Sequence, residues 1–276
     1  MSGGLLYARL VTEQRPPQPS PPGPASSTAD PSLVGLVARG VLDAELAALV
    51  WVLVEARVPL IVAAPADRLG AGGQLLAGII GSIHPDETVS NLTGPLTAAG
   101  ASSLVRGRRA GGVVEAGSLE DVRRRLGGGP MPLNDDQLTF LGCVLVIEEA
   151  TAEGRRGRLR VTAAHYVRPL ARDARGHQQR LDPAVLAAWD PRLERYEHFA
   201  WGVMPEIASR LGRKAGDLEA DVHHRRDDLA GLAKAGVTEL EEVRRLIAGY
   251  RVRWGDGHHG QAESGAHAEG PGHKPH

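Results

Sequence analysis

The residues best placed to do chemistry are three glycines, Gly70, Gly72 and Gly73, which stand between the apolar runs PLIVAA and LLAGII. The backbone N–H groups of a glycine-rich turn can cradle a phosphate where the next helix begins. A complete phosphate loop also carries a lysine that reaches the β- and γ-phosphates and a hydroxyl that holds Mg²⁺. Gln74 stands there instead. The pattern therefore predicts a remnant phosphate loop made of Gly70, Gly72, Gly73 and Gln74.

Arg68 is the cation nearest to these glycines, and it precedes them in the sequence. Lysine occurs only at Lys214, Lys234 and Lys274, far from the glycines along the chain. A side chain ahead of the turn approaches a phosphate from a different direction than a lysine that follows it. We therefore include Arg68 as a candidate nucleotide ligand on its nearness in sequence alone.

A second candidate is Glu148, because the apolar run VLVI leads into Glu148 and Glu149. An acidic residue at the end of a buried strand can polarise a water molecule or bind Mg²⁺ through water. The alternative is that the strand ends at these acidic residues and is followed by a turn exposed to solvent. We favour this alternative and predict no catalytic residue.

Other titratable residues do not predict a metal or nucleic-acid site. Five histidines of the last segment lack a fixed spacing, so we expect no metal site there; they are His258, His259, His267, His273 and His276. Two arginine clusters lack the interleaved aromatic residues on which bases stack, so we expect no nucleic-acid partner. They are Arg106, Arg108 and Arg109, and Arg123–Arg125.

Composition indicates a folded protein of a reducing compartment. Of the 276 residues, 42% are hydrophobic, which is enough to form a core, and the formal net charge is −1. The single cysteine, Cys143, lies among apolar residues, which predicts a core position rather than a nucleophile. The longest apolar runs are too short to cross a bilayer. We therefore expect a cytoplasmic protein without a membrane span.

The chain divides into four parts by composition. We expect a short strand and a proline-rich linker over 1–31, where residues 12–31 hold seven prolines, and an α/β domain over 32–180. A helical subdomain is expected over 181–254. A disordered tail rich in glycine and histidine is expected over 255–276.

Apolar patterns and end signals predict the elements that would position the candidates. Asp43 is a plausible N-cap for an apolar helix, and the continuous run over 59–64 predicts a strand that is buried on both faces. Two further strands are expected over 138–149 and 158–169, and an irregular segment over 94–112. Ser118 is the expected cap of a helix that continues with LEDVRRRL.

Five stretches resemble, in order, segments of the secretion ATPases of the type II secretion, type IV pilus and archaeal-flagellum class, which are P-loop motors. They are PSLVGLVARGVL, LDAELAALVWVLVEARVPLIVAA, IHPDETVS, SLEDVRRRLGGGPMPLNDDQLTFLGCVLVIEEATAEGRRGRLRVTAAHYV and ASRLGRKAGDLEADVHHRRDDLAGLAKAGVTELEEVRRLIAGYR. These stretches lie within 32–93 and 113–251. The resemblance implies a RecA-like P-loop NTPase sheet, trimmed in the middle, with a C-terminal helical subdomain.

The departures from this family fall on its chemistry. Besides the loop lysine and hydroxyl, the glutamate that the family carries after its proline turn is replaced by Asn91, Leu92 and Thr93. The family's Walker B segment has no counterpart between Gly94 and Val113, and VVEAG stands where the family has Thr-x-His-Ala. The resemblance therefore implies a degenerate member.

From the resemblance we expect a catalytically inactive homologue that acts through protein–protein contacts. Its expected partners are active secretion or pilus ATPase subunits or a membrane platform protein. No cofactor is expected, beyond at most weak ATP binding. The alternatives are a divergent ATPase that uses Arg68 and Glu148, and a decayed copy without a role.

Overall fold

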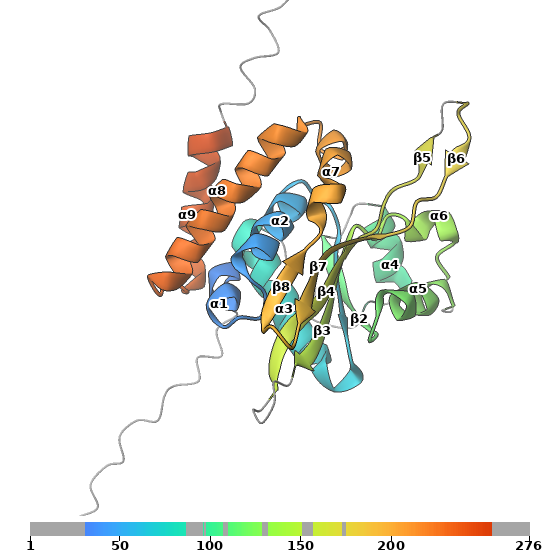
Figure 1. Ribbon diagram of the computed structural model, residues 1–276. Helices are drawn as coiled ribbons and strands as arrows, with labels where there is room; N and C mark the ends of the chain where they lie inside the picture. The colour runs from blue at the N-terminus through green and yellow to red at the C-terminus, as the bar shows by residue number, and fades with distance from the viewer. Residues whose placement is uncertain are drawn as a thin grey trace, which may run out of the picture.

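A computed structural model describes residues 31–86, 96, 98–106, 110–128, 132–150, 157–172 and 175–255. Within these residues a six-stranded sheet, in the order β2-β1-β3-β4-β7-β8, has helices on both faces (Figure 1). The fold is therefore α/β, as the sequence predicts. Residues 1–30 of the expected linker (1–31) and residues 256–276 of the expected tail (255–276) lie outside the described residues.

The parallel half of the sheet is built around β1 (Leu60–Ala64), which pairs with β2 (Gly111–Glu115) on one side and β3 (Cys143–Ala150) on the other. All five residues of β1 are buried. The continuous β-branched and apolar run is the pattern of a strand covered on both faces, and this prediction is confirmed. Cys143 is also buried, as expected, and burial raises the pKa of its thiol to about 12.

The other half of the sheet is antiparallel. β4 (Arg158–Tyr166) pairs with β3, and β7 (Ala184–Asp190) and β8 (Arg195–His198) extend the sheet beyond it. The expectation of helical structure from residue 181 is therefore wrong over its first part. Leu186 and Ala187 are buried, and β7 forms a strand because β4 offers it a hydrogen-bonding edge.

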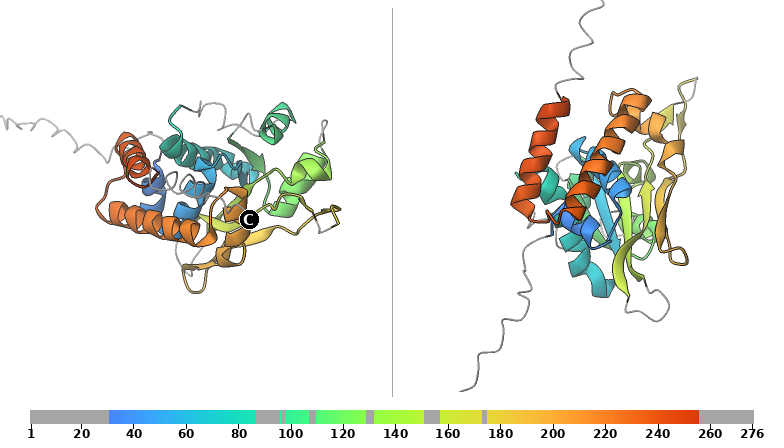
Figure 2. Two further views of the ribbon diagram at one scale, coloured as in Figure 1. Left: turned by 90° about the horizontal axis from the view of Figure 1, so that it is seen from above. Right: turned by 60° about the vertical axis from the view of Figure 1, so that its left-hand side comes forward.

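The core on one face of the sheet is shared by five helices, of which α3 packs on β1 and β2, while α8 and α9 lie outermost, against α1, α2 and α3 (Figure 2). They are α1 (Leu33–Ala38), α2 (Ala44–Glu55), α3 (Leu69–Ile83), α8 (Ala215–Lys234) and α9 (Leu240–Gly255). The Asp43 carboxylate accepts from the backbone N–H of Leu46, so the predicted cap of α2 is confirmed. The shorter η3 (Ala200–Gly202) and α7 (Met204–Arg210) connect β8 to α8.

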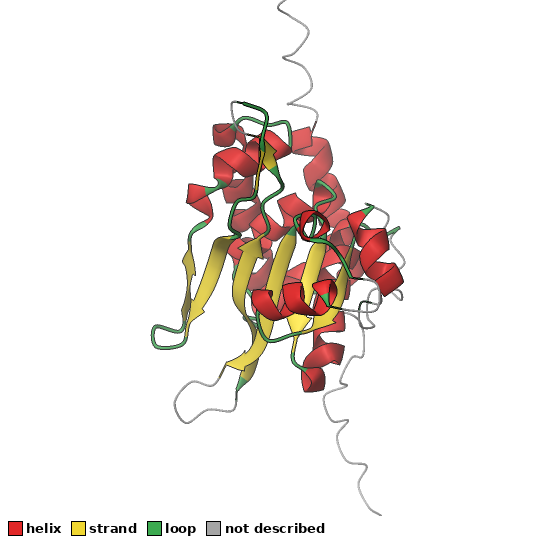
Figure 3. Cartoon of the chain, turned by 90° about the vertical axis from the view of Figure 1, so that its right-hand side faces the viewer, coloured by secondary structure: helices red, strands yellow, loops and turns green. Residues whose placement is uncertain are grey.

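The opposite face carries shorter helices (Figure 3). They are α4 (Ala98–Val105), α5 (Leu119–Gly127) and α6 (Asp135–Leu138), beside a small hairpin of β5 (Ala171–Arg172) and β6 (Gln178–Gln179). The Ser118 hydroxyl accepts from the Asp121 N–H, which confirms the predicted cap of α5. The prediction of an irregular segment over 94–112 missed α4, whose Ala101 and Leu104 are buried.

A buried ionic network ties the last two helices to α2. The Arg225 guanidinium lies 2.8 Å from an Asp221 oxygen and 2.5 Å from a Glu55 oxygen, and its side chain is only 7% exposed. Trp51 lies under the guanidinium, at 4.4 Å from the ring centroid. Burial raises the pKa of the Asp221 carboxyl. Hydrogen bonds from Arg225, Arg213 and Tyr250, together with the charge of Arg225, lower it by a larger amount, so the net pKa lies below the ordinary value.

We expect Arg225→Met to lower the free energy of unfolding by about 1.5–3 kcal/mol, because Asp221 and Glu55 lose their hydrogen-bonded buried partner, although Arg213 and Arg251 remain beside them. Urea unfolding at pH 7 measures the change, and Arg226→Met, whose side chain is 36% exposed, is the matched control. Since the pKa of Asp221 is lowered on folding, its stabilising contribution is present above the ordinary Asp pKa and is lost as the pH falls through the folded value. A variant as stable as the parent chain at neutral pH would contradict the role assigned to Arg225.

Candidate functional site

The glycines of the expected phosphate loop lie inside a helix. Only Pro65 separates β1 from the 3-10 turn η1 (Ala66–Arg68), and α3 follows directly with Gly70, Gly72 and Gly73 in its first turns. A phosphate cradle needs non-helical residues whose N–H groups turn toward one centre. Helical N–H groups beyond the first turn instead donate to carbonyls four residues earlier. The segment expected as a loop is therefore a helix from Leu69 on, and the role of these glycines as a remnant phosphate site stays a prediction.

The glycines have packing roles that differ from one another. A Cβ on Gly72 would lie 3.1 Å from Val113 and 3.2 Å from Ala64, so this glycine lets α3 approach the sheet closely. A Cβ on Gly70 would meet nothing within 4 Å. Gly73 is buried, and Gln74 is exposed on the helix surface. Of the four predicted site residues, Gly72 and Gly73 are therefore buried, whereas Gly70 and Gln74 lie on the surface of the helix.

Arg68 points to β3. Its guanidinium forms a hydrogen-bonded ion pair with Glu149 and lies 3.6 Å from the carboxylate of Asp67. The Arg68 and Glu149 side chains are 40% and 42% exposed, so solvent screens the pair and its contribution to stability is small. Arg68 thus already has two acidic neighbours where the candidate role required an open cation.

Glu148 and Glu149 are successive residues of a strand, so their side chains point to opposite faces of the sheet. Glu148 is exposed and lies opposite Arg160 in the β3–β4 register. It is therefore not brought together with Arg68, which contacts Glu149 from the other face. The two residues that the divergent-ATPase alternative combines do not share a site.

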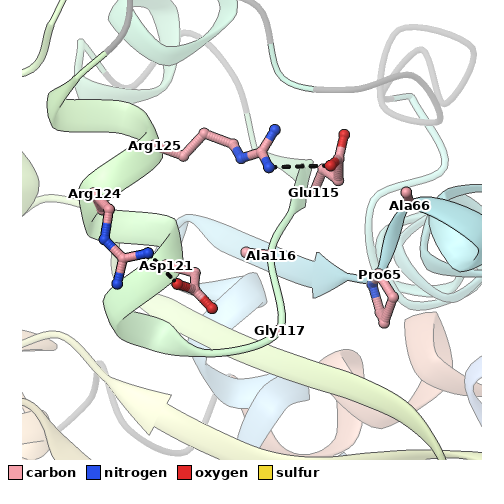
Figure 4. Close-up of a pocket in the computed structure, with 8 residues that line it drawn as sticks. All are labelled: Pro65, Ala66, Glu115, Ala116, Gly117, Asp121, Arg124 and Arg125. Carbon is pink, nitrogen blue, oxygen red and sulfur yellow. Dashed lines mark hydrogen bonds and ion pairs between the residues drawn. The ribbon is translucent and has the colours of Figure 1, made fainter.

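The polar cavity of this sheet lies instead at the carboxyl ends of β1 and β2. The chain leaves β1 toward α3 on one face and leaves β2 toward α5 on the other, so the two connections diverge there. Ligands of open α/β sheets bind in crevices outside the carboxyl ends of the strands. The cavity, about 400 Å³, is lined by Pro65, Ala66, Glu115, Ala116, Gly117, Asp121, Arg124 and Arg125 (Figure 4). We call it the switch-point crevice, because the connections that follow β1 and β2 switch to opposite faces of the sheet there.

Charged side chains of the switch-point crevice are paired with each other. Arg125 lies 3.0 Å from the Glu115 carboxylate and Arg124 lies 2.6 Å from that of Asp121 (Figure 4). The Ser118 hydroxyl, followed by Arg124, lowers the pKa of Asp121, so this carboxylate is ionised at neutral pH. The two arginines balance the two acids, and the crevice carries no excess of positive charge that would favour a triphosphate.

Sequence reasoning did not identify the switch-point crevice. It singled out VVEAG and the Ser118 cap separately, without the strand order that places them beside Pro65. The available signal was a buried strand followed at once by a capped helix, since two such units side by side create a crevice at their carboxyl ends.

The described residues hold no cluster of three or more histidine, cysteine, aspartate or glutamate side chains that could bind a metal ion. The tail histidines and Asn91, Leu92 and Thr93 lie outside the described part of the chain. No helix of the described residues is long and apolar enough to cross a membrane. Of the arginine clusters, Arg123–Arg125 lies on α5 and its side chains have acidic partners.

In comparisons with known proteins, no family model matches the chain and no curated protein matches its sequence.

We expect Gly70→Ala to raise the free energy of unfolding by about 0.5–1 kcal/mol, because an exposed helical position with open space favours alanine over glycine. The matched change Gly72→Val should lower it by about 1–3 kcal/mol, since the added methyl groups overlap β1 and β2. Chemical denaturation of both variants tests the pair. Destabilisation by Gly70→Ala would mean that residue 70 needs a loop conformation, contrary to the helix described here.

Proposed function

We propose that the chain is a non-hydrolytic relative of the secretion and pilus ATPases, with a trimmed RecA-like sheet, and that it acts through protein–protein contacts. The observation that carries the proposal is the helical glycine segment. Where a P-loop motor opens a loop around phosphate, this chain continues from β1 through one proline into η1 and α3.

The charges needed for phosphoryl transfer are the second support. Catalysis of this reaction rests on positioned cations, a metal and a residue that orients water, and loss of one such group typically costs about 10²–10⁵ in rate. Arg68 is bound to Glu149, Glu148 faces away from it, and the loop lysine and hydroxyl are absent from the sequence. A chain with all of these changes retains at most weak ATP binding and needs no cofactor.

The divergent-ATPase alternative requires two rearrangements. Arg68 would have to exchange the Glu149 carboxylate for a phosphate, and the start of α3 would have to unwind to form a loop. Unwinding moves Leu75 and Leu76, both buried in the core, unless it stops within the first turn. These costs favour the binding function over turnover.

As partners we propose active subunits of a secretion or pilus ATPase, or the membrane platform protein on which such a motor works. Contacts between subunits use the outer surfaces of helices and strands, and these can persist when an active site decays. The proposed setting is the cytoplasm, where such a motor meets ATP.

ATP with Mg²⁺ at millimolar concentration is expected to leave the melting temperature unchanged and to release no phosphate above background. A ligand that binds the folded state must stabilise it by an amount that rises with its concentration. Differential scanning fluorimetry and a phosphate assay measure both. Arg68→Ala and Glu148→Gln should then behave as the parent chain does, apart from small changes in stability.

A rise in melting temperature with phosphate release that Arg68→Ala or Glu148→Gln abolishes would overturn the proposal in favour of the enzyme. Glu197→Gln, an exposed residue on β8, is the control for loss of a carboxylate elsewhere. The partner part has its own test: the tagged chain, purified from its native cells, should bring down an intact secretion or pilus ATPase. Recovery of the chain without such a motor, at native expression and low salt, would contradict it.

A further inference from the structure

A second cavity, of about 220 Å³, lies on the face of the molecule opposite the short helices, between α2, α8 and the η3–α7 segment. We call it the Trp201 groove. Its lining residues are Glu45, Leu49, His198, Ala200, Trp201, Met204, Glu219, Val222 and His223. Leu49, Met204 and Val222 are buried and form an apolar floor.

Trp201 is the most exposed large hydrophobic residue of the described chain, with 77% of its surface open to solvent. It stands beside the groove on η3, and Phe199 just before it is 41% exposed. An aromatic side chain at the edge of an apolar cavity is characteristic of a surface that binds another segment of polypeptide. The groove is therefore a candidate docking surface.

The rim of the groove carries two carboxylates and two imidazoles, those of His198 and His223, and His198 is paired with a further carboxylate. Glu45 and Glu219 line it, and Asp43 lies just outside it, where its carboxylate is 2.8 Å from His198. The same Asp43 caps α2, so the rim is anchored to the helix below it. An occupant that complements this surface combines apolar rings with a basic residue.

We propose that the Trp201 groove binds the proline-rich segment of the same chain, residues 15–24, as an intramolecular ligand. The segment reads RPPQPSPPGP, with Arg15 as its one charged residue. This inference does not depend on the proposed relation to secretion ATPases, because it uses only the groove and the sequence of the segment.

Proline-rich peptides suit such a groove for a physical reason. They favour the extended polyproline II conformation before they bind, so little conformational entropy is lost, and their rings pack on aromatic side chains. Pro16, Pro17 and Pro19 supply rings for Trp201 and the apolar floor. Arg15 places one positive charge against Glu45 and Glu219.

The segment is long enough to reach the groove. The described chain begins at Pro31, whose carbonyl oxygen lies against α3 at Gly78. Residues 24 to 15 lie seven to sixteen residues before Pro31, and at about 3.1 Å each this length spans roughly 20–50 Å, which exceeds the radius of gyration of about 17 Å for a domain of this size. A tether of this length gives the segment an effective concentration near the millimolar range, so even a weak site is occupied.

Acrylamide quenching of Trp201 fluorescence tests the proposal in the full chain. The Trp201 signal is the difference between the parent chain and Trp201→Phe, since three other tryptophans are present. We expect the triple change Pro16→Ser, Pro17→Ser and Pro19→Ser to raise the Trp201 quenching constant by about twofold, because the ring loses its cover. A synthetic peptide of residues 12–26 should restore the protection in that variant.

A charge exchange and a proline control make the test specific. Glu219→Lys should raise Trp201 quenching, and adding Arg15→Glu to it should restore protection, while Pro271→Ser with Pro275→Ser, the matched change at the other end of the chain, should have no effect. Unchanged quenching in the Pro16/Pro17/Pro19 variant would overturn the proposal. Protection that grows with protein concentration, with dimers in sedimentation, would also overturn it, since the occupant would then be a second copy.

Discussion

The constraint on which the rest of the structure depends is the complete burial of β1. Leu60–Ala64 pairs with a parallel strand on each side and has a helical layer on each face. Its backbone groups and its side chains therefore have no access to water along the strand. Whatever follows β1 must reach the surface of the sheet at once, and here the chain does so by turning at Pro65 directly into a helix.

This placement explains why glycines that suggest a loop form a helix. Each glycine in a helix interior costs about 1 kcal/mol relative to alanine. On the same helix, however, at most 1% of the surface of four large apolar residues is exposed; they are Leu75, Leu76, Ile79 and Ile80. Burial of such side chains contributes about 1.5–3 kcal/mol each. The packing of α3 on the sheet therefore outweighs the local propensity, and Gly72 contributes by letting the helix lie close to β1 and β2.

The sequence predicted those parts of the fold in which local pattern and burial agree. The run over 59–64 and the caps Asp43 and Ser118 are of this kind. Prediction from the sequence was wrong where a neighbouring strand decides the secondary structure of a segment. β7 is rich in alanine, and it forms a strand because it pairs with β4. The switch-point crevice could not be predicted from the sequence. It lies between the segment that follows β1 and the segment that follows β2, and these are neighbours only because β1 and β2 are adjacent in the sheet.

The placement of charged side chains distinguishes the ends of the parallel strands from the Trp201 groove. The ion pairs of the switch-point crevice and of Arg68 lie within the chain itself, so each cation that a phosphate would need already has a carboxylate at hydrogen-bonding distance. Displacing such a pair costs a ligand part of its own electrostatic gain. The Trp201 groove differs, because its floor is apolar and its exposed indole gains by being covered. A ligand therefore gains more free energy in the Trp201 groove than at the carboxyl ends of the parallel strands.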